Sequence, residues 1–188
     1  GEVASNGLKV VLIGEPNSGK STLMNYLLQE ERSIVTNIAG TTRDYIEANC
    51  MLNGRLVRLF DTAGIRSNPS KIEQLGIDKS RELMLDADVI LHLLPVNKKS
   101  SREKEDDLSK DVAPDRIWSL GTKSDLSADP SREGSYWHTI SCKTGDGLEE
   151  LKEKLAKIVD SKLENIKDSA FITTSRHKMA LEKARSEL

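Results

Sequence analysis

Residues 14–21 read Gly14-Glu15-Pro16-Asn17-Ser18-Gly19-Lys20-Ser21, which matches the phosphate-binding pattern G-x-x-x-x-G-K-[ST]. The run before this loop, Leu8–Ile13, is almost continuously apolar, and a helical pattern follows from about Ser21 to Glu30. In this order, backbone N–H groups and a helix N-terminus can surround a phosphate. Lys20 is expected to reach the β- and γ-phosphates, and the Ser21 hydroxyl to bind magnesium. The residues predicted to contact nucleotide here are Asn17, Ser18, Gly19, Lys20, Ser21 and Thr22.

Outside this loop, apolar runs alternate with helical patterns, which predicts an α/β fold with a mostly parallel six-stranded sheet and helices on both faces. Together with the phosphate-binding loop, this order resembles the Ras-like P-loop GTPase fold. After the first strand, further strands are expected over 45–52, 56–60, 89–94, 117–120 and 137–140. Asn53-Gly54 predicts a two-residue hairpin between two of them. A last helix should start near Gly147, and its apolar face comprises Leu148, Leu151, Leu155, Ile158 and Val159.

Length and composition limit the classes of protein that remain. The chain has 188 residues, of which 37% are hydrophobic, with a net charge of −2, so there is no global attraction to nucleic acid. No apolar run approaches the roughly 20 residues of a membrane span. Two cysteines are too few for a disulfide framework, which favours a cytoplasmic protein with reduced thiols. Because the chain starts with glycine, we expect a fragment: a linker over 1–7, a GTP-binding domain over 8–163, and the start of a flanking helical domain over 164–188.

A second motif, Asp61-Thr62-Ala63-Gly64, directly follows the expected strand ending at Phe60. Asp61 is predicted to hold the magnesium shell, and Gly64 to bring its backbone N–H to the γ-phosphate. The loop 40–44 reads Gly40-Thr41-Thr42-Arg43-Asp44 and lies between the two motifs. A threonine there can complete the magnesium coordination in the triphosphate state, although the same loop also reads as a polar turn before a strand.

A third motif selects the base. In Thr122-Lys123-Ser124-Asp125, the carboxylate of Asp125 can accept from both N1–H and N2–H₂ of guanine, a donor pair that adenine lacks. The stem of Lys123 is expected along the base plane, and a backbone N–H of Ser141-Cys142-Lys143 at guanine O6. Thr122 replaces the commoner Asn of such motifs, and Cys142 the commoner Ala. Since Thr is shorter, we expect a weaker tether to the phosphate loop and lower affinity, with unchanged base specificity.

The residues that would drive hydrolysis are less evident. Ile65 occupies the position where many small GTPases carry a water-orienting Gln. The sequence context identifies no arginine as an arginine finger, although Arg43 and Arg66 lie in loops that could move. An arginine finger contributes about 10³–10⁵ in rate, so a bound cation could supply the missing charge. A GTP-binding module with little hydrolysis is the alternative.

Several strings resemble the MnmE (TrmE) family of tRNA-modification GTPases. They are Pro16-Asn17, Asn37-Ile38-Ala39-Gly40-Thr41-Thr42-Arg43-Asp44, Asp61-Thr62-Ala63-Gly64-Ile65-Arg66, Glu73-Gln74-Leu75-Gly76-Ile77 and Phe171-Ile172-Thr173-Thr174-Ser175-Arg176-His177. The second G domain of the Der (EngA) ribosome-assembly GTPases shares two of these strings. Der continues with a basic run after Arg66, whereas Ser67-Asn68-Pro69-Ser70 follows here, so MnmE is favoured.

The resemblance to MnmE implies roles that local patterns do not mark. Potassium would be held by Asn17, the carbonyls of Thr36 and Ile38, and Thr41. Thr36, Thr41 and Thr42 would also contact the nucleotide. Magnesium would be held by Ser21, Thr42 and Asp61. Glu73 would orient water, with Lys20 and Gly64 as the other catalytic groups. On the residues alone, Glu73 also reads as a solvated carboxylate, and Asn17 as a side chain bonding its own loop.

The resemblance also implies partners. Two G domains would pair across the nucleotide, promoted by potassium, so the chain would form a homodimer. An MnmG-like partner and tRNA would be engaged only by the full-length protein. We therefore expect this chain to hydrolyse GTP without itself modifying the wobble uridine of tRNA.

Overall fold

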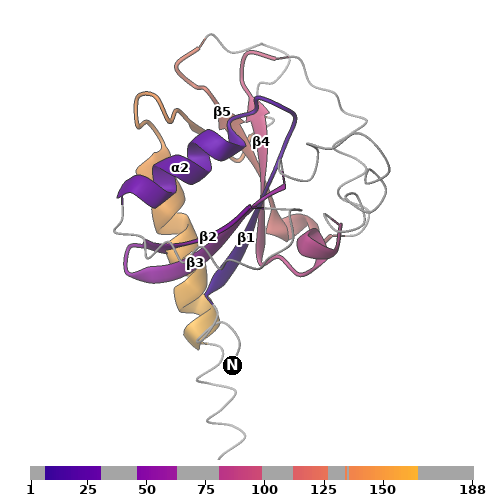
Figure 1. Cartoon of the computed structure of the whole chain (residues 1–188), viewed down its shortest axis with the longest axis vertical. Coiled ribbons are helices and arrows are strands. Elements are labelled where there is room, and N and C mark those ends of the chain that lie inside the picture. The colour runs from indigo at the N-terminus through magenta and orange to yellow at the C-terminus, as the bar shows by residue number, and fades with distance from the viewer. Residues whose placement is uncertain are drawn as a thin grey trace, which may run out of the picture.

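The computed structural model describes residues 7–30, 46–62, 81–98, 112–126, 134 and 136–164. These residues form a six-stranded sheet of order β2-β3-β1-β4-β5-β6 (Figure 1). The strands are β1 Leu8–Ile13, β2 Ile46–Leu52, β3 Arg55–Asp61, β4 Val89–Pro95, β5 Ile117–Thr122 and β6 His138–Ile140. Every pairing is parallel except that of β2 with β3. The predicted mostly parallel sheet is therefore confirmed.

The burial of each strand explains its sequence. All seven residues of β4 are buried, as its apolar run predicted, whereas the edge strand β2 alternates between buried and open positions. The hairpin between β2 and β3 turns at Asn53 and Gly54, whose φ angles are 48° and 74°. Both values lie in the left-handed region that the short hairpin turn requires, so the Asn-Gly prediction is confirmed.

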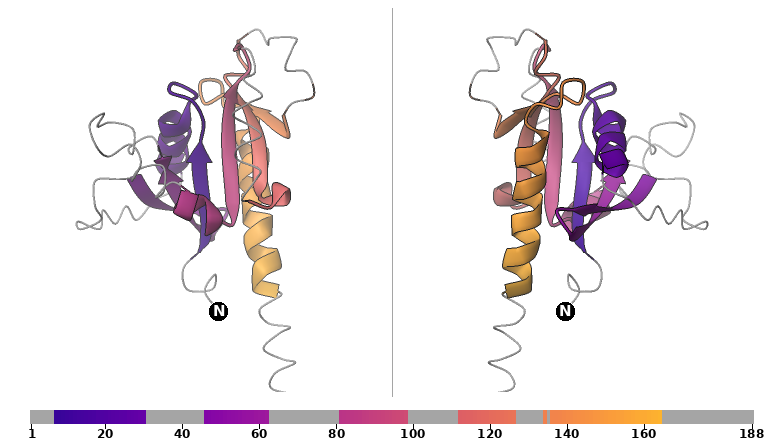
Figure 2. Two further views of the ribbon diagram at one scale, coloured as in Figure 1. Left: turned by 90° about the vertical axis from the view of Figure 1, so that its right-hand side faces the viewer. Right: turned by 90° about the vertical axis from the view of Figure 1, so that its left-hand side faces the viewer.

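Helices cover both faces of the sheet. On one face, helix α2 (Lys20–Glu30) and the helix through 148–164 bury their apolar sides against the strands (Figures 1 and 2). The residues predicted for the apolar side of the last helix all pack into this core or against it, namely Leu148, Leu151, Leu155, Ile158 and Val159. On the other face, Leu83 from the helical residues 81–85 packs with Val11, Phe60 and Ile90.

The parallel pairing determines where functional residues can gather. Strands β1, β3, β4, β5 and β6 run in the same direction, so their carboxyl ends meet at one edge of the sheet. Each of the three sequence motifs begins at such an end, after β1, at the end of β3 and at the end of β5. In open α/β sheets this edge is the usual place of ligand binding.

The predicted strand limits differ from the observed ones by one or two residues. The last expected strand starts at His138 rather than Trp137, although the Trp137 backbone N–H still donates to Ser119 O over 2.8 Å. Strand β3 extends to Asp61 because Asp61 pairs with Leu12 on one side and Ile46 on the other. Within the described residues, no helix is long and apolar enough to cross a membrane.

Candidate nucleotide-binding site

The loop after β1 is shaped by backbone angles that few residues adopt. Gly14 has a φ of +147°, and a Cβ there would lie 2.6 Å from Leu93 O and 2.6 Å from Ser18 Oγ. Asn17 and Gly19 have φ angles of 64° and 103°. Glycine is therefore required where the loop leaves the sheet, because no side chain fits between the loop and β4. The loop then runs directly into the N-terminus of α2, as phosphate-binding loops do.

Lys20 lies within this loop rather than in solvent. Only 6% of the residue is exposed. Its Nζ donates to Gly14 O over 2.8 Å, to Glu15 O over 2.9 Å and to Ser18 Oγ over 3.4 Å. A buried ammonium needs such acceptors to offset its lost hydration. The loop thus holds a positive charge at the point where phosphate oxygens are expected.

Ser21 and Asp61 lie together at the start of α2 and the end of β3. The Ser21 hydroxyl donates to Asp61 Oδ2 over 2.8 Å, and Asp61 is fully buried. A hydroxyl and a carboxylate are oxygen ligands of the kind Mg²⁺ prefers, and Mg²⁺ commonly keeps waters and substrate phosphates as its other ligands. In the described part of the chain, no group of three or more His, Cys, Asp or Glu could form a closed metal cage. This donor set therefore fits a magnesium ion that is shared with phosphates.

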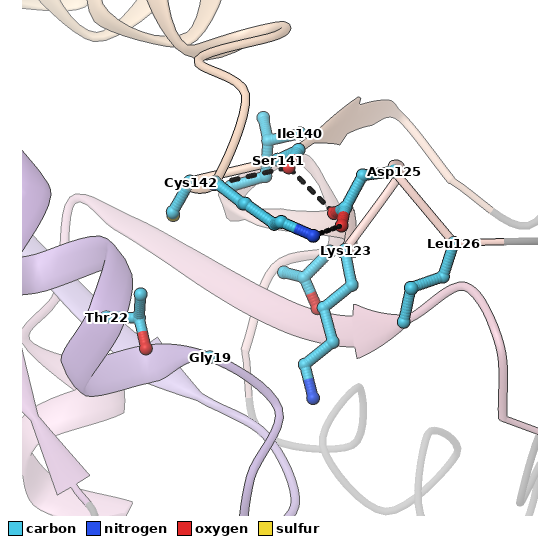
Figure 3. A pocket seen from close by; sticks show the side chains of 10 residues that line it. Gly19, Thr22, Lys123, Asp125, Leu126, Ile140, Ser141 and Cys142 are labelled. Carbon is cyan, nitrogen blue, oxygen red and sulfur yellow. Dashed lines mark hydrogen bonds and ion pairs between the residues drawn. The ribbon is translucent and has the colours of Figure 1, made fainter.

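A pocket of about 220 Å³ opens beside the loop (Figure 3). Gly19 and Thr22 lie on one side of it, and Asp125 and Leu126 on the other. The lining residues are Gly19, Thr22, Thr122, Lys123, Asp125, Leu126, Ile140, Ser141, Cys142 and Lys143. All but Leu126 and Ile140 were predicted to bind nucleotide.

Asp125 is held in its ionised form within this pocket. The Ser141 hydroxyl donates to Asp125 Oδ1 over 2.7 Å, and Lys143 Nζ lies 3.8 Å from Oδ2. The hydrogen bond from Ser141 is the main reason that the pKa of Asp125 is lowered, and the charge of Lys143 adds to it. At neutral pH the carboxylate is consequently an acceptor only, which is the form that recognises the paired donors of guanine.

Two side chains join the base pocket to the phosphate loop. Thr122 Oγ1 donates to Ser18 O over 2.7 Å in a buried hydrogen bond across 104 residues. Lys123 Nζ donates to the neighbouring carbonyl of Asn17 over 2.9 Å. The short Thr122 thus still tethers the two loops, because β5 extends through Thr122 and carries its hydroxyl to within bonding distance of the loop, and the lower affinity expected relative to Asn stays a prediction.

The predicted site residues divide into two groups. The structure brings together Asn17, Ser18, Gly19, Lys20, Ser21, Thr22, Asp61, Thr122, Lys123, Asp125, Ser141, Cys142 and Lys143 at one edge of the sheet. Thr36, Ile38, Thr41, Thr42, Gly64 and Glu73 lie outside the described residues.

Sequence reasoning missed two apolar residues of the pocket. Leu126 is 42% exposed although it is apolar, and it directly follows the base-selecting motif. Ile140 ends β6, so its strand position marked it only as core. An apolar residue placed next to a ligand motif was the signal available for Leu126.

Comparison with known proteins places this site in a family. Residues 9–119 match the family model described as 50S ribosome-binding GTPase. The tRNA modification GTPase MnmE of Brucella anthropi is 39% identical over 172 residues, covering 92% of this chain and 37% of that protein. MnmE of Lactobacillus acidophilus is 36% identical over 194 residues, covering all of this chain and 42% of that protein. The chain therefore spans about two fifths of the length of these relatives.

Solved structures of GTPases have the same fold. The G domain of the T. maritima FeoB iron transporter has a TM-score of 0.58 and 27% identity, covering 80% of this chain and 97% of that one. Era of Aquifex aeolicus, solved with GDP and AlF₄⁻, has a TM-score of 0.58 and 25% identity, covering 79% of this chain and 56% of that one. Since the family model also spans more than half of the sequence, the chain belongs to the 50S ribosome-binding GTPase family and is a GTP-hydrolysing enzyme similar to the G domain of MnmE.

Proposed function

We propose that this chain is the G domain of an MnmE-like GTPase that acts in modification of the tRNA wobble uridine. The observation that carries the proposal is the buried bond from Thr122 to Ser18, which joins the pocket lined by Asp125 to the loop after β1. The similarity to MnmE over the whole chain supports the tRNA assignment. In this proposal residues 1–7 are a linker, 8–163 the G domain and 164–188 the start of a helical domain, and the longer protein acts in the cytoplasm with tRNA and an MnmG-like partner.

The base would be selected by Asp125. Its ionised carboxylate accepts N1–H and N2–H₂ of guanine, while Ser141 keeps it oriented through the 2.7 Å hydrogen bond to Oδ1. Adenine presents an acceptor at N1 and no amino group at C2, so it would leave the carboxylate unsatisfied in the pocket. The unpaired group makes such a site discriminate strongly against the wrong base.

Phosphate oxygens would replace the present hydrogen-bond acceptors of Lys20. Its Nζ now donates to Gly14 O and Glu15 O and would donate to β- and γ-phosphate oxygens instead. Ser21 and Asp61 would hold magnesium together with Thr42 and the phosphates. When bound, magnesium neutralises charge on the β- and γ-oxygens, which lowers the barrier to phosphoryl transfer.

Two further elements of the proposal rest on the resemblance to MnmE. Glu73 would orient the attacking water in place of the missing Gln at Ile65, with the Gly64 N–H on the γ-phosphate. Potassium would be held by Asn17, Thr36, Ile38 and Thr41. Of these four residues, only Asn17 lies within the described part of the chain. The cation would supply the positive charge that an arginine finger provides in other GTPases, and would favour pairing of two G domains.

The alternatives carry less support. A ribosome-assembly role of the Der type would suit the name of the family model, but relatives named MnmE match this chain over its full length. A GTP-binding module with little hydrolysis is less favoured, because the chain belongs to a GTPase family.

Replacing Asp125 with Asn should weaken GTP binding and improve binding of xanthosine triphosphate. The amide would present a donor where the carboxylate accepts, which suits the carbonyl of xanthine. Two hydrogen bonds to a charged group contribute about 3–6 kcal/mol, so the loss for GTP should be roughly 10²–10⁴-fold. Calorimetry with both nucleotides measures it, and Asp146→Asn, an equal change of charge outside the pocket, serves as the control. Undiminished GTP binding by the Asp125 variant would place the base elsewhere.

Labelling of Cys142 should report whether the pocket is occupied. Cys142 lines the pocket and burial raises its pKa, while Cys50 is only 1% exposed. The thiolate is the reactive form, so N-ethylmaleimide should react slowly at pH 7 and faster as the pH rises past the ordinary thiol range. Saturating GDP should suppress the reaction, followed by mass spectrometry, whereas ATP should not. Cys142→Ala is the control for residual labelling at Cys50, and equal rates with and without GDP would contradict the assignment of the pocket.

Potassium should stimulate GTP turnover more than sodium at equal ionic strength. We expect at least a roughly tenfold difference, below the about 10³–10⁵ that an arginine finger contributes. Steady-state phosphate release measures turnover, and light scattering measures pairing of the chain. Asn17→Ala should reduce the difference between the two salts. Equal rates for the unaltered chain in both salts would remove potassium from the proposal.

Glu73→Ala should slow hydrolysis while nucleotide affinity stays nearly unchanged. General acid–base groups contribute about 10²–10⁴ in rate, and a loss in that range is expected. Single-turnover hydrolysis and calorimetry separate the two effects. Glu150→Ala, at an exposed position of the last helix, is the matched control. An unchanged rate for the Glu73 variant would show that another group orients the water.

A further inference from the structure

Thr62 makes a hydrogen bond that the mechanism above does not use. Its hydroxyl donates to the backbone carbonyl of Leu12 over 3.0 Å, between residues 50 positions apart. Leu12 is the register partner of Asp61 in the parallel pairing of β1 with β3. Thr62 is the residue after the last pair, so a side-chain donor continues the contact between the two strands where their backbone pairing ends.

This bond lies at a junction between the phosphate loop and the candidate magnesium ligands. Leu12 is two residues before Gly14, where the loop leaves β1, and Thr62 directly follows Asp61. Asp61 in turn accepts a 2.8 Å hydrogen bond from Ser21. The contacts therefore form a closed ring: β1 leads through the loop to Ser21, Ser21 bonds Asp61, and the residue after Asp61 bonds back to β1.

The ring restricts how far Asp61 can move relative to Ser21. Asp61 is already paired with Leu12 and Ile46, and the bond from Thr62 adds a further contact to β1 one residue beyond the last pair, where β3 ends. Asp61 is fully buried, so a small displacement of the carboxylate would misplace a charge that has little access to water. Because Mg²⁺ demands near-ideal octahedral geometry, its affinity depends on such displacements.

We propose that Thr62 is a positioning residue that sets the distance between Asp61 and Ser21 and thereby tunes magnesium-dependent nucleotide binding. The inference deepens the proposed function and rests on it, since the magnesium site belongs to the same GTPase reaction. Thr62 itself touches neither nucleotide nor metal in this proposal. Its effect passes through the backbone of β3 to the Asp61 carboxylate.

The test compares GDP affinity in magnesium with GDP affinity in EDTA. Thr62→Val keeps the shape of the side chain but removes the donor. It should weaken GDP binding about three- to tenfold in magnesium, the effect of losing one hydrogen bond, and leave binding in EDTA unchanged. Thr62→Ser restores the hydroxyl and should restore the magnesium response. Thr139→Val, the same exchange at an exposed position of β6, should behave as the unaltered chain.

The possible outcomes separate this inference from the proposed function. If Thr62→Val weakens GDP binding equally with and without magnesium, or not at all, Thr62 has no positioning role. The proposed function would still stand in that case, provided that the unaltered chain binds GDP more tightly in magnesium than in EDTA. If the unaltered chain itself binds neither GDP nor GTP, the proposed function fails. Thermal unfolding of each variant without nucleotide shows whether the fold is retained. If the Thr62→Val variant does not fold, the test rests on Thr62→Ser, and a Ser variant that fails to match the magnesium response of the unaltered chain would overturn the inference.

Discussion

The parallel pairing of β1 with both of its neighbours is the constraint from which the site follows. Strand β1 lies between β3 and β4 and is hydrogen-bonded to each in the same direction. The loop that leaves β1 must therefore emerge beside the ends of β3 and β4. Had β3 run antiparallel to β1, Asp61 would lie at the opposite edge of the sheet from Ser21, and the oxygen ligands for magnesium would not meet.

Polar groups buried at this edge show how the fold accommodates chemistry inside its core. Of the seven buried polar or charged residues in the described part of the chain, five belong to the candidate site, namely Ser18, Lys20, Asp61, Thr122 and Ser141. Burial of such groups costs free energy unless each finds a partner. Here their hydrogen-bond partners belong to the candidate site itself, so the bonds that satisfy these groups also fix the geometry of the site.

Hydrogen bonds link the candidate phosphate loop to the candidate base loop. The carbonyls of two adjacent loop residues, Asn17 and Ser18, accept from Lys123 and Thr122. A movement of the candidate base loop would therefore be passed to the candidate phosphate loop. Cys142 and Leu126 also line the pocket and take part in neither of these two bonds.

Local sequence patterns determined which segments form strands, where the hairpin turns at Asn53-Gly54, and which motifs are candidates for binding phosphate and guanine, because spacing and backbone preferences act over a few residues. The structure decided the contacts between distant segments: that Thr122 reaches Ser18 despite its short side chain, that Leu126 lines the pocket, and that Thr62 bonds Leu12. Such contacts depend on the order and register of the strands in the sheet and on where each strand ends. No pattern within a single segment carries that information. Thr122 and Ser18 lie 104 residues apart in the sequence, and their hydrogen bond forms only because the folded sheet places them side by side.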